Sequence, residues 1–545
     1  MKRILATILV TFLILGTFVM SVSAEETAAE APTHDEATCE SVPVIFCEGA
    51  WHALYLNAGT PEQVEGWNTG GGGNDIVADL QKILPELPKY IRDEEWEKIA
   101  DILANFTNAI LGPIAFDSKG ESLRPFDGDL ARMNEELARD HKADPSVRAY
   151  HFNYDWRQDP WVLAERLKTF IDQVCETTGH STVNVAAQSG SGCLFLAYLA
   201  RYGTHALRAV TVRATLHEGS SIFGDVVNKR LKLDADALAT TGFLRDFSVF
   251  GNPEDDDPEL AQAAQKKLKT VSSALQAANQ AGFLRAVSAM VNRAFPRFMD
   301  RLYDKAIIPT ALTMPIFWAY VPMQDYESGK ETCFGDKRGE YTELINKLDR
   351  YHYKVQVNAD KLIKEAQQKI RLGYYLGTGS PLFPLLENAN ANSDGFVDTV
   401  YASAGATVGD PLGKKLGKLG IVFQKNKDGH DHLSPDKTID ASTCLLPEYT
   451  WFVADAPHIG GTNEPFAYWF FDSRKTQNVF SDPAYPQWLV LSKTPPEGGG
   501  DKLFVPQDNP TFWQKVTAAL NPAARVKDLM LGLVNFLMFL ATWWI

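Results

Sequence analysis

The 545-residue chain is short of positive charge, with 53 Lys and Arg against 68 Asp and Glu, a net charge of −15 and a pI near 5.3. A nucleic-acid binder needs clustered Lys and Arg to displace phosphate counterions, so the composition argues against this class. Glycine and proline, at 39 and 29 residues, are too few for a collagen-like or low-complexity chain. The 45% hydrophobic and 22% charged residues are typical of a globular protein.

The six cysteines contain no C-x-x-C pair. Structural zinc sites and thioredoxin-like redox sites use that spacing, so neither is supported.

The N-terminus has the pattern of a targeting segment. Lys2 and Arg3 precede an apolar run over residues 4–20 and small residues over 21–24. This predicts a secretory signal peptide over residues 1–24, with an uncleaved anchor helix as the alternative. Residues 25–40 are expected to be flexible, and the mature protein to be secreted or to stay in the secretory-pathway lumen. Export makes disulfides permissible, although six cysteines pair in 15 ways that spacing does not separate.

The C-terminal tail, residues 525–545, is hydrophobic. Residues 529–545 are interrupted by one polar amide, Asn535, and their length is at the lower edge of a membrane span. Three hypotheses stay open: a membrane anchor, a lipid-anchor signal, and a helix packed into the fold. The first two would attach the protein to a membrane.

Strand-like and helix-like segments alternate along the middle of the chain, which predicts an α/β domain over residues 41–520 with a mostly parallel sheet and helices on both faces. Helix-like sequence without strand runs interrupts it at about 79–111 and 225–325, and we interpret these insertions as a cap or lid. The expected strands are 42–46, 147–152, 182–187, 209–214, 369–377 and 449–454, and the expected helices include 161–175 and 192–202.

One strand-to-helix junction predicts chemistry. The strand at 182–187 runs into Gln188-Ser189-Gly190-Ser191-Gly192 and then a helix. A nucleophile elbow of an α/β-hydrolase needs this order, with small residues two positions either side of the serine. Ser189 is the nucleophile candidate and Ser191 its rival. A glycine-rich turn without catalytic function is the alternative interpretation.

The acid and the base are expected later in the chain, each after a further strand. Asp394 follows the strand at 369–377, and His458 follows the strand at 449–454. His430 and His432 are rivals to His458, but their charged surroundings suit an exposed loop better.

The expected oxyanion donors are backbone N–H groups. The first is that of Gly190, directly after the nucleophile, and the second that of Ala50 or Trp51, in the loop after the first strand.

Several segments together resemble the lecithin:cholesterol acyltransferase-like branch of the α/β-hydrolases. Residues 153–157, Asn-Tyr-Asp-Trp-Arg, are similar to its Tyr-Asp-Trp-Arg motif, and Asp394-Gly395-Phe396-Val397 resembles its Asp-Gly-Thr-Val. Further similar segments lie at 43–49, 187–192, 214–220 and 315–322. Gln188 stands where the family has His, Ser191 where it has Gly, and Phe396 where it has Thr.

The resemblance implies a serine O-acyltransferase or phospholipase acting on a lipid ester, with an acyl-enzyme on Ser189 and water or an alcohol as acceptor. It also implies that no metal and no cofactor is needed. A membrane or lipid-particle surface is the implied partner, and nucleic acid is not. Trp51 and Trp318 are candidate substrate-binding residues. The alternatives are a non-catalytic lipid-binding or surface protein on a hydrolase scaffold, motivated by Gln188 and Ser191, and a general carboxylesterase.

Overall fold

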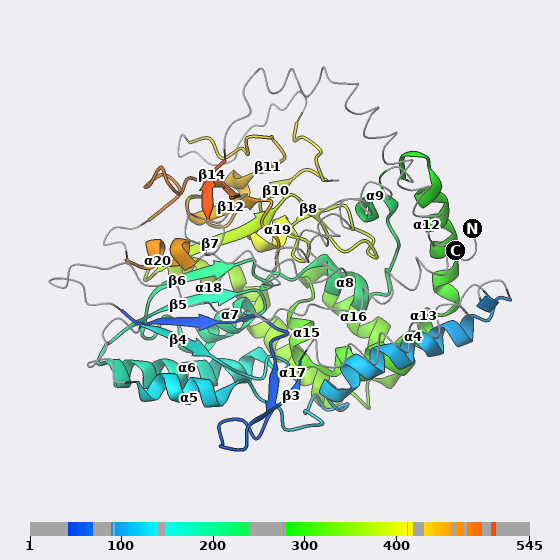
Figure 1. Ribbon diagram of the computed structural model, residues 1–545, viewed down its shortest axis with the longest axis horizontal. Helices are drawn as coiled ribbons and strands as arrows, with labels where there is room; N and C mark the ends of the chain where they lie inside the picture. The colour runs from blue at the N-terminus through cyan, green and yellow to red at the C-terminus, as the bar shows by residue number, and fades with distance from the viewer. Residues whose placement is uncertain are drawn as a thin grey trace, which may run out of the picture.

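The structure is a computed structural model (Figure 1). It describes residues 42–68, 89–90, 93–139, 148–239, 276, 279–410, 412–417, 430–458, 464–472, 477–492 and 503–507. The expected signal peptide over 1–24, the segment 25–40 and the tail over 525–545 lie outside the described residues, as do parts of both expected cap insertions.

Eight of the described strands form one sheet, in which every neighbouring pair is parallel except the last. This confirms the predicted α/β class. In spatial order the strands are β4 (Ala149–Phe152), β1 (Val44–Cys47), β5 (Val183–Gln188), β6 (Leu207–Arg213), β7 (Arg371–Thr378), β12 (Thr450–Ala454), β13 (Trp488–Leu491) and β14 (Phe504–Pro506).

Helices cover both faces of the sheet. α6 (Pro160–Thr178) packs on α7 (Ser191–Tyr202) on one face, together with α18 (Ala359–Gln367), whereas α20 (Glu464–Asp472) contacts the other. Because successive strand residues point to opposite faces, Trp451 and Val453 pack with Phe466 and Phe470 of α20, whereas Phe452 between them joins the core on the α6 side.

Local sequence sets the ends of α6. The Asp159 side chain accepts a hydrogen bond from the N–H of Trp161, and Pro160 occupies the first helical position. Both features favour helix initiation, since the cap satisfies an orphan donor and Pro lacks one. Gly179 ends the helix with a φ of 72°.

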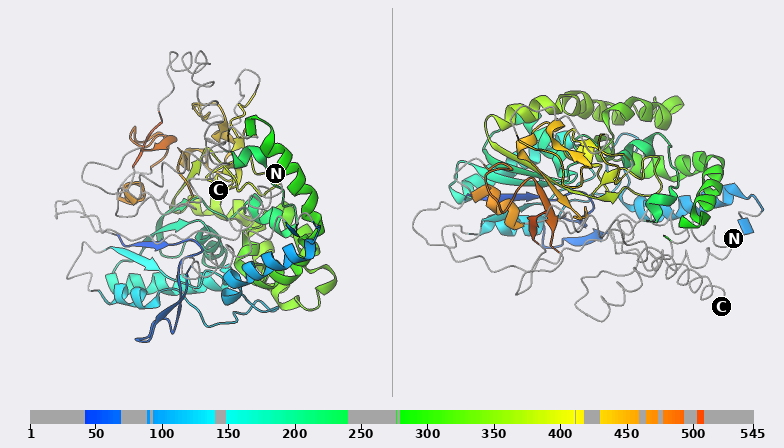
Figure 2. Two further views of the ribbon diagram at one scale, coloured as in Figure 1. Left: turned by 45° about the vertical axis from the view of Figure 1, so that its right-hand side comes forward. Right: turned by 90° about the horizontal axis from the view of Figure 1, so that it is seen from above.

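A second group of helices lies to one side of the sheet in both Figure 1 and Figure 2. α4 (Trp96–Leu111) belongs to the first insertion and α13 (Met299–Leu302) to the second. Asp101 of α4 joins the two insertions, because its carboxylate bonds Arg301 and Lys305. The insertions are therefore helical where they are described, and one packs against the other. The group contains α4 (Trp96–Leu111), α8 (Ser221–Val227), α12 (Phe283–Ala294), α13 (Met299–Leu302), α15 (Pro315–Ala319) and α16 (Met323–Phe334).

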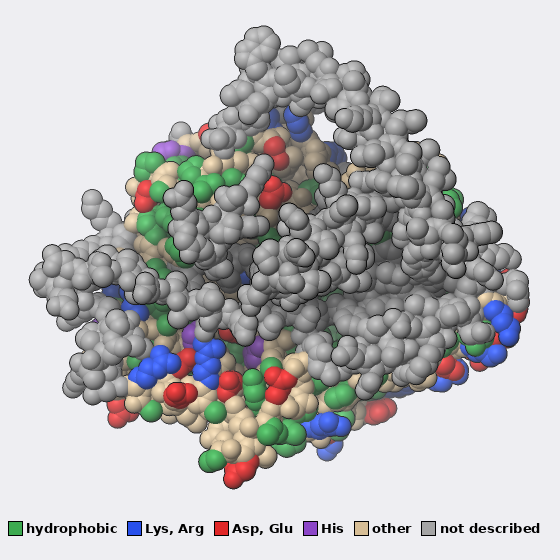
Figure 3. Space-filling view, viewed as in Figure 1, with side chains coloured by type: hydrophobic (Ala, Val, Ile, Leu, Met, Phe, Trp, Pro, Cys, Tyr) green, Lys and Arg blue, Asp and Glu red, His purple; other side chains and the backbone are tan. Residues whose placement is uncertain are grey.

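The surface carries mixed charge: acidic and basic side chains are interspersed over the described part of the face in Figure 3. Among the described residues, no helix combines the length and apolar character needed to cross a bilayer.

The five cysteines in the described part of the chain are unpaired, so a disulfide among them, which export would permit, does not form. Four of them are buried at separate places in the fold, where they pack as small apolar side chains. Cys39 lies outside the described residues.

Candidate active site

The junction between β5 and α7 has the geometry of a nucleophile elbow. Ser189 follows the last residue of β5. Its backbone φ is 53°, in the left-handed region that residues other than glycine rarely adopt. Its N–H donates to the carbonyl of Arg213 at 2.9 Å, and α7 begins two residues later. The strained turn places the serine hydroxyl at the carboxyl end of a central strand, as predicted.

Two glycines let other elements approach this serine. A Cβ on Gly190 would overlap the Tyr320 hydroxyl, and a Cβ on Gly49 would lie 2.8 Å from the Cβ of Ser189. The loop after β1 therefore packs directly against Ser189. Sequence reasoning missed Gly49, although a glycine two residues after a buried strand is a signal of such a close approach.

Ser191, the rival nucleophile, is fully buried. Its hydroxyl lies 2.7 Å from the carbonyl of Cys47 and 2.8 Å from that of Gln188, and it accepts from the Gln188 N–H at 2.7 Å. The hydroxyl thus links the end of β1 to the elbow, and this gives Ser191 a structural role.

Ser189, His458 and Asp394 lie in one hydrogen-bonded row. His458 Nε2 is 2.9 Å from Ser189 Oγ, and its Nδ1 is 2.8 Å from Asp394 Oδ2. The His458 N–H also donates to the Asp394 carbonyl at 2.9 Å, which joins the two loops through the backbone. The proximity that the sequence predicts for residues up to 269 positions apart is therefore present.

Asp394 is held by its own turn. Its Oδ1 accepts from the N–H groups of Phe396 at 3.0 Å and Val397 at 2.8 Å, which leaves Oδ2 to face the imidazole. Gly377 on β7 makes room for this arrangement, because a Cβ there would overlap the carbonyl of Ala456 and approach the Asp394 Cβ to 2.9 Å.

The Tyr-Asp-Trp-Arg segment braces the loop expected to donate to the oxyanion. Tyr154 donates its hydroxyl to the Glu48 carbonyl at 2.6 Å, and Trp156 Nε1 donates to the His52 carbonyl at 3.0 Å. The His52 ring lies between the carbonyls of Tyr154 and Gly49, at 2.9 and 3.0 Å. His52 is a bracing residue that sequence reasoning missed.

The two charged residues of that segment hold each other. Arg157 bonds both carboxylate oxygens of Asp155, at 2.7 and 2.8 Å, and also donates to the carbonyl of Ile114. Both side chains are buried, so removing one would leave the other charge unpaired. The motif as a whole thus fixes a loop against the elbow.

Trp51, in the same loop, has a φ of 80° and stays partly exposed. Its ring lies 4.9 Å from that of Trp156, 5.7 Å from Phe317 and 6.2 Å from Trp67, measured between ring centroids. These rings form an aromatic wall beside the elbow, in which Trp67, Trp156 and Phe317 are buried and Trp51 alone is partly exposed.

Trp318 does not belong to that wall. It is 1% exposed, donates through Nε1 to the Leu312 carbonyl, and stacks on Phe334. The expectation that Trp318 binds substrate is therefore wrong in this structure: its side chain is used to pack α15 against α16, and Phe317 faces Trp51 instead.

The two rival histidines lie elsewhere. His430 stacks on Phe480, whereas His432 is fully buried and bonds the Gln487 side chain at 2.7 Å. The expectation of an exposed loop is wrong for His432, since residues far along the chain cover it.

The turn after β6 packs directly behind the elbow, with the Leu216 N–H donating to the Ser189 carbonyl at 3.3 Å. Burial lowers the pKa of His217 to about 4 and raises the pKa of Glu218 to about 8. At neutral pH this turn is therefore mostly uncharged.

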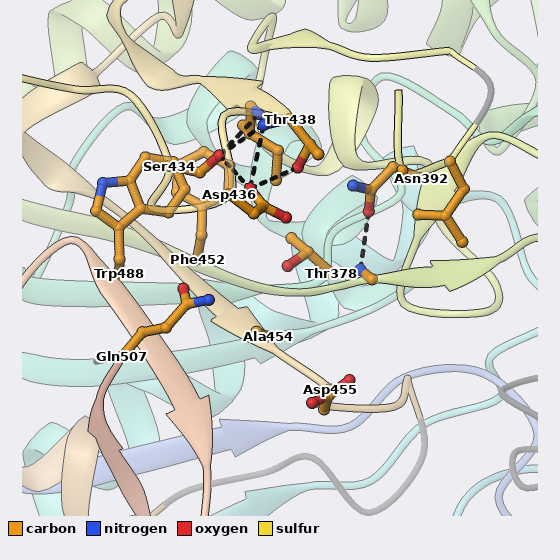
Figure 4. A pocket seen from close by; sticks show the side chains of 14 residues that line it. Thr378, Asn392, Ser434, Asp436, Thr438, Phe452, Ala454, Asp455, Trp488 and Gln507 are labelled. Atoms are coloured by element: carbon orange, nitrogen blue, oxygen red, sulfur yellow. Dashed lines mark hydrogen bonds between the residues drawn. The ribbon is translucent and has the colours of Figure 1, made fainter. Parts of the chain in front are cut away.

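A separate pocket of about 340 Å³ opens beyond the carboxyl ends of β7 and β12 (Figure 4). Phe452 and Trp488 stack along one side, while the other labelled side chains, among them Asp436 and Asp455, are mostly polar. Such a lining suits a hydrophilic group rather than an acyl chain. Within the described part of the chain, no three His, Cys, Asp or Glu side chains are grouped to hold a metal.

No protein-family model matches the chain. It is similar to triacylglycerol lipases from two bacteria: Pseudarthrobacter phenanthrenivorans, 31% identical over 119 residues that cover 22% of this chain and 37% of that lipase, and Burkholderia plantarii, 31% identical over 119 residues that cover 22% and 33%. The chain thus matches about a third of the length of these curated relatives. The similarity supports a lipase-like hydrolase relationship and does not single out the lecithin:cholesterol acyltransferase-like branch.

Proposed function

We propose that this protein is a serine hydrolase of lipid esters, and more narrowly a lecithin:cholesterol acyltransferase-like acyltransferase or phospholipase. The observation that carries the proposal is the row Ser189 Oγ, His458 Nε2, His458 Nδ1, Asp394 Oδ2, with contacts of 2.9 and 2.8 Å. A serine hydroxyl needs such a base, and the base such a partner, to act as a nucleophile near neutral pH.

In the proposed reaction, His458 Nε2 takes the Ser189 proton as Oγ attacks the ester carbonyl carbon. Asp394 keeps the other ring nitrogen protonated and stabilises the imidazolium. The carbon–oxygen bond to the leaving alcohol then breaks, and His458 returns the proton to that alcohol. Water or a second alcohol attacks the acyl-enzyme by the same steps in reverse.

The developing oxyanion would be met by the N–H of Gly190 and by that of Ala50 or Trp51. The contact between Gly49 and Ser189, together with the bonds from Tyr154 and Trp156, supports this assignment because it keeps the loop beside the nucleophile. Preorganised donors of this kind are worth about 10²–10³-fold in kcat each.

A lipid is the substrate that the observations favour. Trp51, the partly exposed ring of the aromatic wall, offers apolar surface beside the elbow, and the similarity to triacylglycerol lipases points to lipid esters such as triacylglycerol. We propose that the helical insertions cover this surface as a lid, and that the protein meets its substrate at a membrane or lipid-particle surface after export.

The test is a substrate panel with purified wild type and Ser189→Ala. We expect wild type to cleave dispersed phospholipid or triacylglycerol faster than a short soluble ester, and Ser189→Ala to lose about 10⁴–10⁶-fold in kcat. Adding a sterol or another alcohol then separates acyl transfer from hydrolysis.

Two results would contradict the proposal. Faster turnover of the short soluble ester alone would identify a general carboxylesterase. Lipid binding without ester turnover would identify a non-catalytic lipid-binding protein.

A further inference from the structure

Arg213 connects the two loops that carry Ser189 and His458, which come from strands that are not neighbours. Arg213 is the last residue of β6, and its carbonyl accepts the N–H of Ser189 at 2.9 Å. Its main chain is thereby fixed to the elbow.

The guanidinium of the same residue reaches the other loop. Arg213 Nη2 donates to the His458 carbonyl at 2.8 Å and to the Pro457 carbonyl at 3.1 Å. β7 lies between β6 and β12 in the sheet, so the side chain spans the end of one strand to reach the loop after the next. One residue thus bonds both the nucleophile and the base.

Burial of the Arg213 guanidinium costs desolvation free energy. Arg213 is 4% exposed, its Nη1 has no hydrogen-bond partner, and among the described residues no carboxylate forms an ion pair with it. The Asp394 carboxylate attracts the guanidinium only from beyond ion-pair distance, so burial costs Arg213 hydration that its contacts do not fully replace. Arg157, by comparison, is equally buried but bonds both oxygens of Asp155.

We propose that Arg213 is a positioning residue, which sets the separation of Ser189 Oγ and His458 Nε2 by bonding the first through its backbone and the loop of the second through its guanidinium. The inference rests on the proposed function. A residue that is costly for stability and spans two reacting groups is expected to act on rate rather than on folding, because a displacement of about 1 Å can cost ~10²-fold in rate.

The test uses the full-length protein with Arg213→Met and Arg213→Lys. We expect Arg213→Met to lower kcat about 100-fold on the best ester while KM changes less than about twofold, since substrate contacts are unaffected. Arg213→Lys should recover part of the loss, because an ammonium can donate to the same carbonyls but lacks the planar fork. The rate of Ser189 labelling by a fluorophosphonate should fall in parallel with kcat.

Arg371→Met is the matched control. Arg371 is the first residue of β7, at the opposite end of the sheet, and its guanidinium also donates to a backbone carbonyl, that of Phe471, at 2.7 Å. Its loss should leave kcat unchanged. The unfolding midpoint of Arg213→Met should lie within a few degrees of wild type, because removing a buried unpaired cation offsets the lost hydrogen bonds.

Two outcomes would overturn the inference: wild-type kcat in Arg213→Met, or a fall in activity that is fully explained by a smaller folded fraction. A wild type that neither turns over esters nor labels at Ser189 would instead overturn the proposed function on which the inference rests.

Discussion

Different interactions dominate around Ser189 and around the Asp394–His458 pair. On the nucleophile side, Gly190 against Tyr320 and Gly49 against Ser189 leave no room for a Cβ, so contact fixes the elbow. On the acid–base side Gly377 is also tightly packed, but hydrogen bonds orient the Asp394 and His458 side chains. We therefore expect the nucleophile side to be the more sensitive to added volume, and the acid–base side to the exchange of a hydrogen-bond donor or acceptor.

Asp394→Asn tests the hydrogen-bonded half and should have the largest effect. The amide oxygen can still accept from Phe396 and Val397, but the amide nitrogen would face His458 and favour the wrong tautomer. We expect kcat to fall about 10⁴-fold with little change in the unfolding midpoint. Asp398→Asn, four residues on and bonded to Ser221, is the control and should keep kcat.

Gly190→Ala tests the contact-held half. The added methyl would overlap the Tyr320 hydroxyl, so the elbow should shift and kcat should fall about 10²-fold or more. The double variant Gly190→Ala/Tyr320→Phe should recover part of the rate, because the overlapping oxygen is gone. Strictly additive losses in the double variant would contradict a steric cause.

Ser191→Ala separates the two serines. The change leaves the Cys47 carbonyl and the Gln188 N–H without their shared partner, so we expect unfolding free energy to fall by about 1–3 kcal/mol. Fluorophosphonate labelling of the folded protein should continue. Chemical denaturation with parallel labelling checks both, and loss of labelling at wild-type stability would restore Ser191 as a nucleophile.

Glu218→Gln should have the smallest effect, and on stability alone. Because the folded-state pKa of Glu218 is raised from 4.5 to about 8, the folded protein binds the proton more tightly than the unfolded chain. Its stability contribution is therefore full below about pH 4.5 and is lost as pH rises toward 8. Unfolding midpoints at pH 5, 7 and 9 should show a smaller decline in Glu218→Gln, and an identical decline would contradict a buried, proton-binding Glu218.

The sequence predicts the central strands well, because a parallel strand buried on both faces is a run of apolar residues. β1, β5, β6, β7 and β12 begin and end within about two residues of the predicted ranges. The four-residue β13 and the three-residue β14, the last two strands on one side of the sheet, were not predicted, since such short strands depend on pairing with a distant neighbour.

In the site, too, the sequence predicts the residues that follow a recognisable strand and not those that depend on distant contacts. Ser189, Asp394 and His458 follow predicted strands, so strand order alone brings them to one edge of the sheet. Gly49, His52 and Arg213 were missed because their importance lies in contacts with residues distant in sequence. The prediction that Trp318 binds substrate was wrong for a related reason. The sequence alone does not distinguish an aromatic side chain in the core from one at a binding surface.

The most direct test of the account is to treat the full-length wild type, Ser189→Ala and His458→Gln with a fluorophosphonate and locate the adduct by peptide mass spectrometry. The account predicts one adduct on Ser189 in wild type, none in Ser189→Ala, and labelling slowed by several orders of magnitude in His458→Gln. Adduct formation that is unchanged in Ser189→Ala, or as fast in His458→Gln as in wild type, would contradict it.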